Sequence, residues 1–184
     1  MPAVDTFRVD ASPDRIVNAA ELRALQAPLK NRYRGDPATA VVTSHADADL
    51  VPNAIAVDVE SGARRVRAGL HPATGGDGSL ACSADLVLDA LVACAGVTLQ
   101  AVATAMGITI RSGRIHAEGT WDARGTLGVS REVPVGLTAI QLRFDLDSDA
   151  SPEQLPRLLE LTERYCVVAQ TLRAGVAVSI SSAE

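Results

Sequence analysis

The stretch SADLVLDALVACAGVTLQAVATAM at residues 83–106, followed by Gly107, decides the fold. Ser83 is expected to cap a helix, and Asp85 in its first turn complements the positive end of the helix dipole. Gly107 supplies a glycine stop at the other end. Because the interior is apolar nearly all round, the pattern predicts a long helix that is buried on most of its faces.

The composition is that of a soluble globular protein. The chain has 184 residues, of which 47% are hydrophobic and 21% are charged, and its net charge is −5. This length fits one domain. The Lys and Arg residues are scattered, which argues against a face that binds nucleic acid. Asp89, Thr98 and Gln100 in the long apolar stretch favour a buried helix over a membrane span.

The N-terminal region predicts an arm and one helix ahead of the main fold. Residues 1–15 have neither the basic start nor the apolar core of a signal peptide, so we expect a cytoplasmic protein. Ser12 and Pro13 suit the N-cap and first position of a helix. This helix is expected to be disturbed at Pro28 and to end before Gly35.

The remaining pattern alternates strands and helices within an α+β fold. We expect an N-terminal arm and helix over residues 1–36 and a single main domain over residues 37–184. The short turn Ser61-Gly62 joins two of the expected strands into a hairpin. A capping-box pattern at Ser151 and Gln154 opens a second helix that runs to about Tyr165. Strands are expected at residues 38–44, 54–60, 63–70, 108–122, 133–147 and 176–182.

Cysteine is the residue type with the most chemical interest. Cys94 lies among small residues in the long helix, and Cys166 follows a polar stretch at the end of the second helix. Each can be read as a small core residue or as half of a redox site. Cys82 precedes the long helix, where unpaired N–H groups would lower the pKa of its thiol.

Metal and cofactor motifs are not found. His45, His71 and His116 show no zinc-ligand spacing with one another or with the cysteines. The chain also has no G-x-S-x-G nucleophile elbow, P-loop or dinucleotide fingerprint. We therefore expect neither a metal nor a cofactor.

Two motifs together resemble the OsmC/Ohr superfamily of osmotically inducible and organic hydroperoxide resistance proteins. They are SADLVLDALVACAGVTLQAVATAMGI at residues 83–108 and LTERYCVVAQTL at residues 161–172, with matching strands between them. The resemblance covers roughly residues 37–184. It implies an OsmC-like fold, in which antiparallel sheets wrap around a long buried central helix, with an extra N-terminal helix here. It also implies an intertwined homodimer with active sites at the subunit interface.

The same resemblance implies catalytic roles for two cysteines. Cys94 matches the peroxidatic cysteine, which attacks an organic hydroperoxide and becomes a sulfenic acid. Cys166 matches the resolving cysteine, which condenses with that sulfenic acid to a disulfide. A dithiol, such as a lipoylated protein, would then reduce the disulfide.

The chain departs from the family pattern near the peroxidatic cysteine. Ser83 and Ala84 stand where classical members have Pro-Glu, and Asp85 is a poor substitute because one residue rotates a helical side chain by about 100°. Val167 stands where a proline usually follows the second cysteine. Without a cationic partner, Cys94 is expected to have a raised pKa and to react slowly. The arginines that could replace the family's activating arginine are Arg32, Arg34, Arg124 and Arg164.

Two functions follow from these observations. The favoured one is a thiol-dependent peroxidase of the oxidative stress response, in which Cys94 and Cys166 reduce organic hydroperoxides. The alternative is a non-catalytic OsmC-like dimer that binds a small apolar ligand or acts as a slow redox sensor. The missing carboxylate favours the alternative, and the cysteine pair favours the peroxidase.

Overall fold

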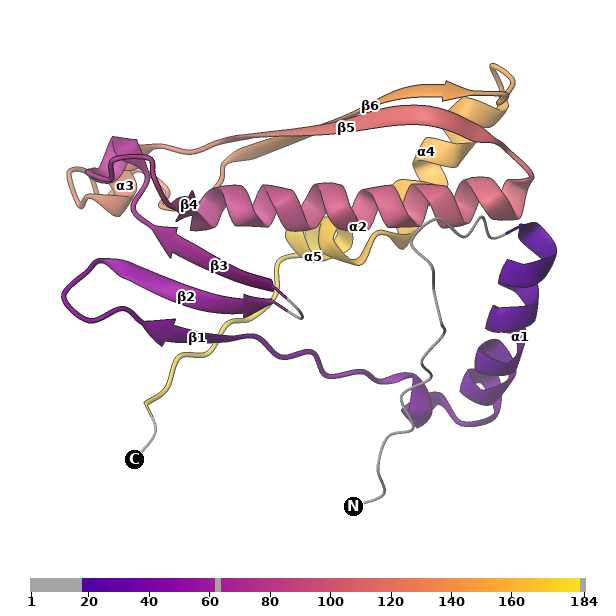
Figure 1. Ribbon diagram of the computed structural model, residues 1–184, viewed down its shortest axis with the longest axis horizontal. Coiled ribbons are helices and arrows are strands. Elements are labelled where there is room, and N and C mark those ends of the chain that lie inside the picture. The colour runs from indigo at the N-terminus through magenta and orange to yellow at the C-terminus, as the bar shows by residue number, and fades with distance from the viewer. Residues whose placement is uncertain (1–17, 62–63, 183–184) are drawn as a thin grey trace.

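A single long helix runs through the middle of an α+β molecule in the computed structural model (Figure 1), which describes residues 18–61 and 64–182. This helix, α2, spans Ser83–Met106. The ribbon of β5 (Ile110–Thr120) and β6 (Ala139–Ser148) lies along it, and α4 (Gln154–Tyr165) and α5 (Val167–Ala174) pack against it. The remaining elements are α1 (Ala19–Gly35), η1 (Pro37–Ala40), β1 (Asp47–Leu50), β2 (Ala56–Ser61), β3 (Arg64–Gly69), η2 (Pro72–Thr74), β4 (Ala81–Cys82) and α3 (Ala123–Thr126).

The ends of α2 are set as the sequence indicates, apart from a shift of one residue. Cys82 occupies the N-cap position without a side-chain hydrogen bond, so Ser83 is the first helical residue and not the cap. Gly107 ends the helix with a φ of +72°, in the left-handed region that glycine adopts most easily. Its N–H donates to the carbonyls of Ala103 and Thr104.

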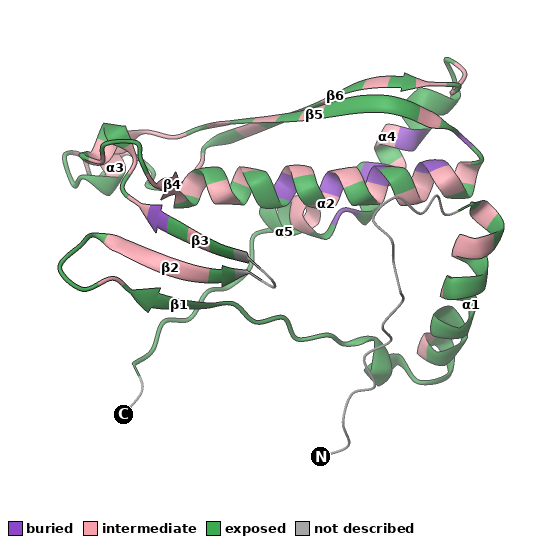
Figure 2. Cartoon of the chain, in the orientation of Figure 1, coloured by how far each residue is buried: buried purple, intermediate pink, exposed green. Residues whose placement is uncertain are grey.

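The prediction that α2 is buried on most faces is wrong for this chain. Only a stripe at every fourth position is buried (Figure 2), and it consists of Leu91, Ala95, Leu99 and Ala103. Val97, which lies off this stripe, is 73% exposed. The reason is that β5, α4 and α5 cover only part of the helix circumference. By length and composition α2 is apolar enough to cross a membrane, but the core helix of a soluble protein has the same character.

The β5–β6 ribbon packs closely on α2. The two strands are antiparallel, with Ile115 opposite Phe144. Glycine at position 96 permits the close approach, because a Cβ atom there would lie 3.0 Å from Ile115 Cδ1. Phe144 packs against both buried clusters of the core, one around Leu99 and the other around Leu91.

The N-terminal sheet confirms one predicted hairpin and corrects one predicted strand. β2 and β3 pair in antiparallel register, with Asp58 opposite Arg67 and an ion pair of 2.6 Å between them. Residues 38–44 form no strand. The carboxylate of Asp36 accepts a hydrogen bond from the Ala38 N–H and starts a 3₁₀ turn, so the first strand begins only at Asp47. The four strands lie in the order β1-β2-β3-β4.

Helix α1 begins later than predicted. Asn18 is its N-cap and forms a capping box with Glu21, which fixes the first helical residue at Ala19. The predicted start at Ser12 and Pro13 lies outside the described residues. The helix continues through Pro28 to Gly35.

The C-terminal third contains a helix that the sequence analysis missed and lacks the strand that it predicted. The capping box before α4 is confirmed, because Ser151 and Gln154 exchange side-chain-to-backbone hydrogen bonds. Helix α5 follows at once, after a single extended residue. Residues 176–182 are exposed and form no strand, since no other described strand lies alongside them.

The α4 helix provides a test of where the core lies. We expect Leu158→Ala to lower the free energy of unfolding by about 2–5 kcal/mol, because the Leu158 side chain is 0% exposed. Leu155→Ala, on the same helix but 37% exposed, should cost less than about 1 kcal/mol. Urea denaturation at one fixed protein concentration measures both. Equal losses would contradict this assignment of the core.

Candidate functional site

The fold brings Cys94 and Cys166 together where α5 packs on the middle of α2. Cys166 is the C-cap of α4 and the N-cap of α5, with an extended backbone (φ −73°, ψ 108°) that bends the chain between the two helices. Its side chain is 1% exposed and packs in one cluster with Leu91 and Ala95 of α2. Cys94 is half-buried and packs against the same cluster.

The environment of Cys94 favours its thiolate. Burial raises the pKa of the thiol, but hydrogen bonds from the Val168 N–H, the Cys166 thiol and the Val167 N–H act in the opposite direction. The hydroxyl of Thr98, one helical turn further along α2, adds a fourth donor. The net result is a lowered pKa, so the expectation of a raised pKa at Cys94 is wrong. The first N–H groups of α5 lack partners within the helix and are free to point at the sulfur.

Cys166 has the opposite tendency. Burial raises its pKa, and the neighbouring Cys94 raises it further, while the Ala169 N–H works against both. That N–H donates to Cys166 Sγ at 3.5 Å, which is the N-cap interaction of α5. The arrangement therefore favours ionisation of Cys94 over ionisation of Cys166.

None of the four arginines proposed from sequence is among the groups that shift the pKa of Cys94. Arg124 pairs with Asp122 at 2.6 Å, and Arg164 lies over the ring of Tyr165 with 5.5 Å to its centre. The other two, Arg32 and Arg34, interact with neighbours on their own helix. The sequence analysis missed the backbone donors because it did not assign α5. Residues 167–174 contain neither Gly nor Pro, and this uninterrupted run was the available sequence signal for a helix.

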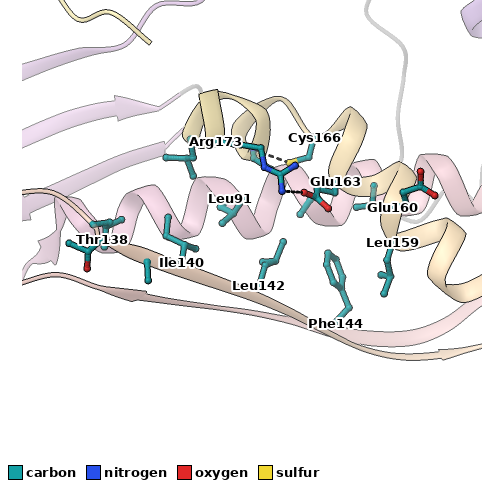
Figure 3. Close-up of a pocket in the computed structure, with 16 residues that line it drawn as sticks. Leu91, Thr138, Ile140, Leu142, Phe144, Leu159, Glu160, Glu163, Cys166 and Arg173 are labelled. Carbon is teal, nitrogen blue, oxygen red and sulfur yellow. Dashed lines mark hydrogen bonds and ion pairs between the residues drawn. The ribbon is translucent and has the colours of Figure 1, made fainter. Parts of the chain in front are cut away.

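A largely apolar pocket with a volume of about 610 Å³ opens beside Cys166 (Figure 3). Its size is typical of small-molecule sites. Cys166 is among the residues that line it, and Cys94 is not. The apolar side chains that form its walls include Leu91, Ile140, Leu142, Phe144, Leu159 and Leu172.

Charged groups stand at one side of this pocket. Glu163 of α4 and Arg173 of α5 form an ion pair of 2.6 Å, and both also line the pocket. Gln170 donates to the Glu163 carbonyl at 2.8 Å and adds a second link between the two helices. Both partners of the ion pair are more than half exposed, so its contribution to stability is small.

Cys82 lies apart from the cysteine pair. Twelve positions separate it from Cys94, which corresponds to about 18 Å along a helix axis. It lines a smaller pocket of about 240 Å³ with His71 and Trp121, whose rings meet edge to face at 5.2 Å. In the part of the chain that the structure describes, no three His, Cys, Asp or Glu side chains come close enough to hold a metal ion.

The donor set around Cys94 can be tested at Thr98. We expect Thr98→Val to raise the pKa of the Cys94 thiol, because a hydroxyl donor is lost while the side-chain shape is kept. The rate of Cys94 alkylation by iodoacetamide, followed by mass spectrometry, should then rise at a higher pH than in the unmodified protein. Thr104→Val, about 15 Å from Cys94 along the axis of α2, serves as the control. If the pH dependence of the Cys94 alkylation rate shifts equally in both variants, the role assigned to Thr98 is contradicted.

Comparisons with known proteins place this arrangement in a family. A family model described as OsmC-like protein matches residues 76–181. An OsmC-like protein from Mycoplasma pneumoniae superposes with a TM-score of 0.62 at 19% identity, over 73% of this chain and 89% of that one. No curated protein sequence matches the chain.

Two further structures carry names that mention organic hydroperoxides. An organic hydroperoxide resistance protein OsmC from Legionella pneumophila superposes with a TM-score of 0.57 at 16% identity, over 72% of this chain and 90% of that one. The organic hydroperoxide resistance protein OhrB of Bacillus subtilis gives 0.51 at 17% identity, over 73% and 93%. These likenesses show a common fold. Because the family model matches more than half of this chain's residues, the chain belongs to the OsmC-like protein family.

Proposed function

We propose that this protein is a thiol-dependent peroxidase that reduces organic hydroperoxides through Cys94 and Cys166. The observation that carries the proposal is the packing of both cysteines in one cluster, where hydrogen-bond donors lower the pKa of Cys94 while the pKa of Cys166 is raised. A peroxidatic thiol must be ionised to react, and a resolving thiol must be close enough to condense with the product. The two cysteines differ in the way that these two roles require.

The chemistry takes place in two steps. The Cys94 thiolate attacks one oxygen of the hydroperoxide, the O–O bond breaks, and the alkoxide leaves and takes a proton to become an alcohol. Cys94 is then a sulfenic acid. Cys166 attacks the Cys94 sulfur, its proton and the hydroxyl leave as water, and a disulfide joins the two residues. Rapid disulfide formation protects Cys94 from oxidation to the sulfinic acid.

Three features support an organic substrate and a cytoplasmic enzyme. The pocket beside the pair is lined mainly by Leu, Ile and Phe side chains, which suits an alkyl group. Two proteins of the same fold carry the name organic hydroperoxide resistance protein. The cycle also needs a dithiol reductant, such as a lipoylated protein, and the cytoplasm keeps such thiols reduced.

We also propose that the working form is a homodimer. Many apolar side chains of the single chain are exposed, and a monomer rarely exposes a large apolar patch. They lie on the uncovered side of α2, in and on both sides of β1, and in the C-terminal residues 176–182, and include Val41, Val42, Leu50, Ile55, Val97, Val176, Val178 and Ile180.

The molecular mass in solution tests the homodimer proposal directly. We expect light scattering to give twice the chain mass of 19.1 kDa, because burial of these side chains favours association. Ile180→Asp and Val178→Asp together should shift the protein towards monomer, whereas Leu25→Asp on α1 should not. A monomer at all concentrations in the unmodified protein would contradict the proposal.

Mass spectrometry of the cysteine oxidation states tests the peroxidase proposal. We expect one equivalent of cumene hydroperoxide to convert reduced protein to a Cys94–Cys166 disulfide within seconds. Cys94→Ser should leave the hydroperoxide unconsumed, and Cys166→Ser should accumulate sulfinic or sulfonic acid at Cys94. Cys82→Ser is the matched control and should react as the unmodified protein does.

The alternative function predicts the opposite result. If all three thiols remain unchanged over minutes with excess hydroperoxide, the peroxidase proposal is wrong. The pocket of about 610 Å³ would then favour the non-catalytic OsmC-like protein that binds a small apolar ligand. Slow formation of the disulfide over minutes, without turnover, would favour a redox sensor.

A further inference from the structure

We propose that Gln170 is a positioning residue for Cys94: its side-chain amide links helix α5 to the last turn of α4, and this link holds the first N–H groups of α5 on the Cys94 sulfur. Gln170 is not among the groups that donate to Cys94, so it acts through the position of α5. The catalytic consequence of this inference rests on the proposed function, because it is the ionised thiol that attacks a hydroperoxide.

The orientation of α5 sets the direction of two of the donors at Cys94. The Val167 and Val168 N–H groups lie in the first turn of α5, and the peptide groups of a helix are aligned roughly parallel to its axis. A change in the angle or position of α5 relative to α2 therefore moves both donors away from the sulfur together. The Thr98 hydroxyl belongs to the same helix as Cys94 and does not depend on α5.

Helix α5 has few other contacts that fix its orientation. It contains eight residues, none of which is buried, and a helix of this length is marginal in water by itself. It packs on the Leu91 cluster of α2 through Val168 and Ala169. Its C-terminal end leads into residues 176–182, which are exposed and pair with no described strand. The orientation of α5 therefore depends strongly on how it is joined to α4.

The corner between α4 and α5 consists of a single residue. Cys166 alone is extended between the two helices, with φ −73° and ψ 108°, and its two backbone dihedrals can rotate. The Gln170 side chain restrains this corner, because its Nε2 donates to the Glu163 carbonyl at 2.8 Å. Glu163 lies in the last turn of α4, where carbonyls lack a partner within the helix. The same hydrogen bond therefore satisfies the end of α4 and fixes the start of α5.

The other link between α5 and Glu163 is weaker and lies farther from the donors. The Arg173 guanidinium pairs with the Glu163 carboxylate at 2.6 Å (Figure 3), but both side chains are more than half exposed, where an ion pair contributes little. Arg173 also lies about 9 Å from Val167 along the axis of α5. Gln170 is half-buried and lies only about 4.5 Å from Val167 along the same axis. Gln170 is therefore the residue that fixes the N-terminal turn of α5.

The pH dependence of Cys94 alkylation by iodoacetamide tests this role. Gln170→Met keeps the length of the side chain and removes its amide donor without adding charge. We expect the midpoint of the alkylation curve to rise by about half a pH unit, so that the rate below the midpoint falls about threefold. The reason is that poorly placed N–H donors stabilise the Cys94 thiolate less. Thr171→Met introduces the same side chain at the next, exposed position of α5 and should leave the midpoint unchanged.

Two double variants show whether Gln170 acts through the α5 donors. Val167→Pro removes one of these N–H groups directly, at a first helical position that tolerates proline. Because both changes affect the same donors, Gln170→Met should add less to the midpoint in the Val167→Pro protein than it does in the unmodified protein. It should add its full shift in the Thr98→Val protein, since Thr98 donates from α2. The reverse pattern would overturn the role of Gln170.

Hydrogen exchange followed by mass spectrometry reports on α5 without any reaction at sulfur. We expect the amides of residues 167–170 to exchange about threefold faster in Gln170→Met, because α5 leaves its place on α2 more often. The amides of residues 154–162 in α4 should exchange as they do in the unmodified protein. If Gln170→Met does not fold, Gln170→Ala replaces it, since alanine has the highest helix propensity, and it should give the same two results.

The outcomes separate this role from the proposed function. An unchanged alkylation midpoint in a folded Gln170 variant overturns the positioning role, whatever the reaction with hydroperoxide. A raised midpoint in a protein that does not react with cumene hydroperoxide overturns the peroxidase and leaves the role of Gln170 standing. Where both hold, kcat/KM for cumene hydroperoxide should fall about threefold below the midpoint and return to the unmodified value above it. A loss of kcat/KM that persists at high pH would contradict a role in positioning the donors.

Discussion

The packing of the first turn of α5 against the middle of α2 is the contact on which the site depends. It buries Cys166 beside Leu91 and Ala95, and it directs the Val167 and Val168 N–H groups to Cys94. Small residues at this level of α2 allow the approach. Because α5 begins directly after α4, with Cys166 serving both helices as a cap, a shift of either helix would move the Cys166 sulfur and the donors together.

This contact also supplies Cys94 with donors other than the charged pair that the family resemblance implies for classical members. A carboxylate and an arginine stabilise a thiolate by charge, whereas here the donors are two backbone N–H groups, a hydroxyl and the second thiol. Backbone donors are fixed by the helix and do not need a buried cation, which is costly to desolvate.

The difference between Cys94 and Cys166 arises from position on the fold and not from local sequence. Both lie in apolar runs, and both lose solvation on burial. Only Cys94 lies in front of the α5 N-terminus, whereas Cys166 belongs to that terminus and faces the pocket. The two sulfurs therefore differ both in their hydrogen-bond donors and in their access to the pocket.

The sequence by itself determined the α+β class, the span and glycine stop of α2, the β2–β3 hairpin, the β5–β6 strands and the start of α4. These features depend on local periodicity, caps and turns, which neighbouring residues encode. Only the tertiary structure decided which side of α2 is buried and that Cys94 has a lowered pKa. The burial and pKa depend on segments distant in sequence that meet through packing, as residues 94 and 166 do, and no local pattern records such a meeting.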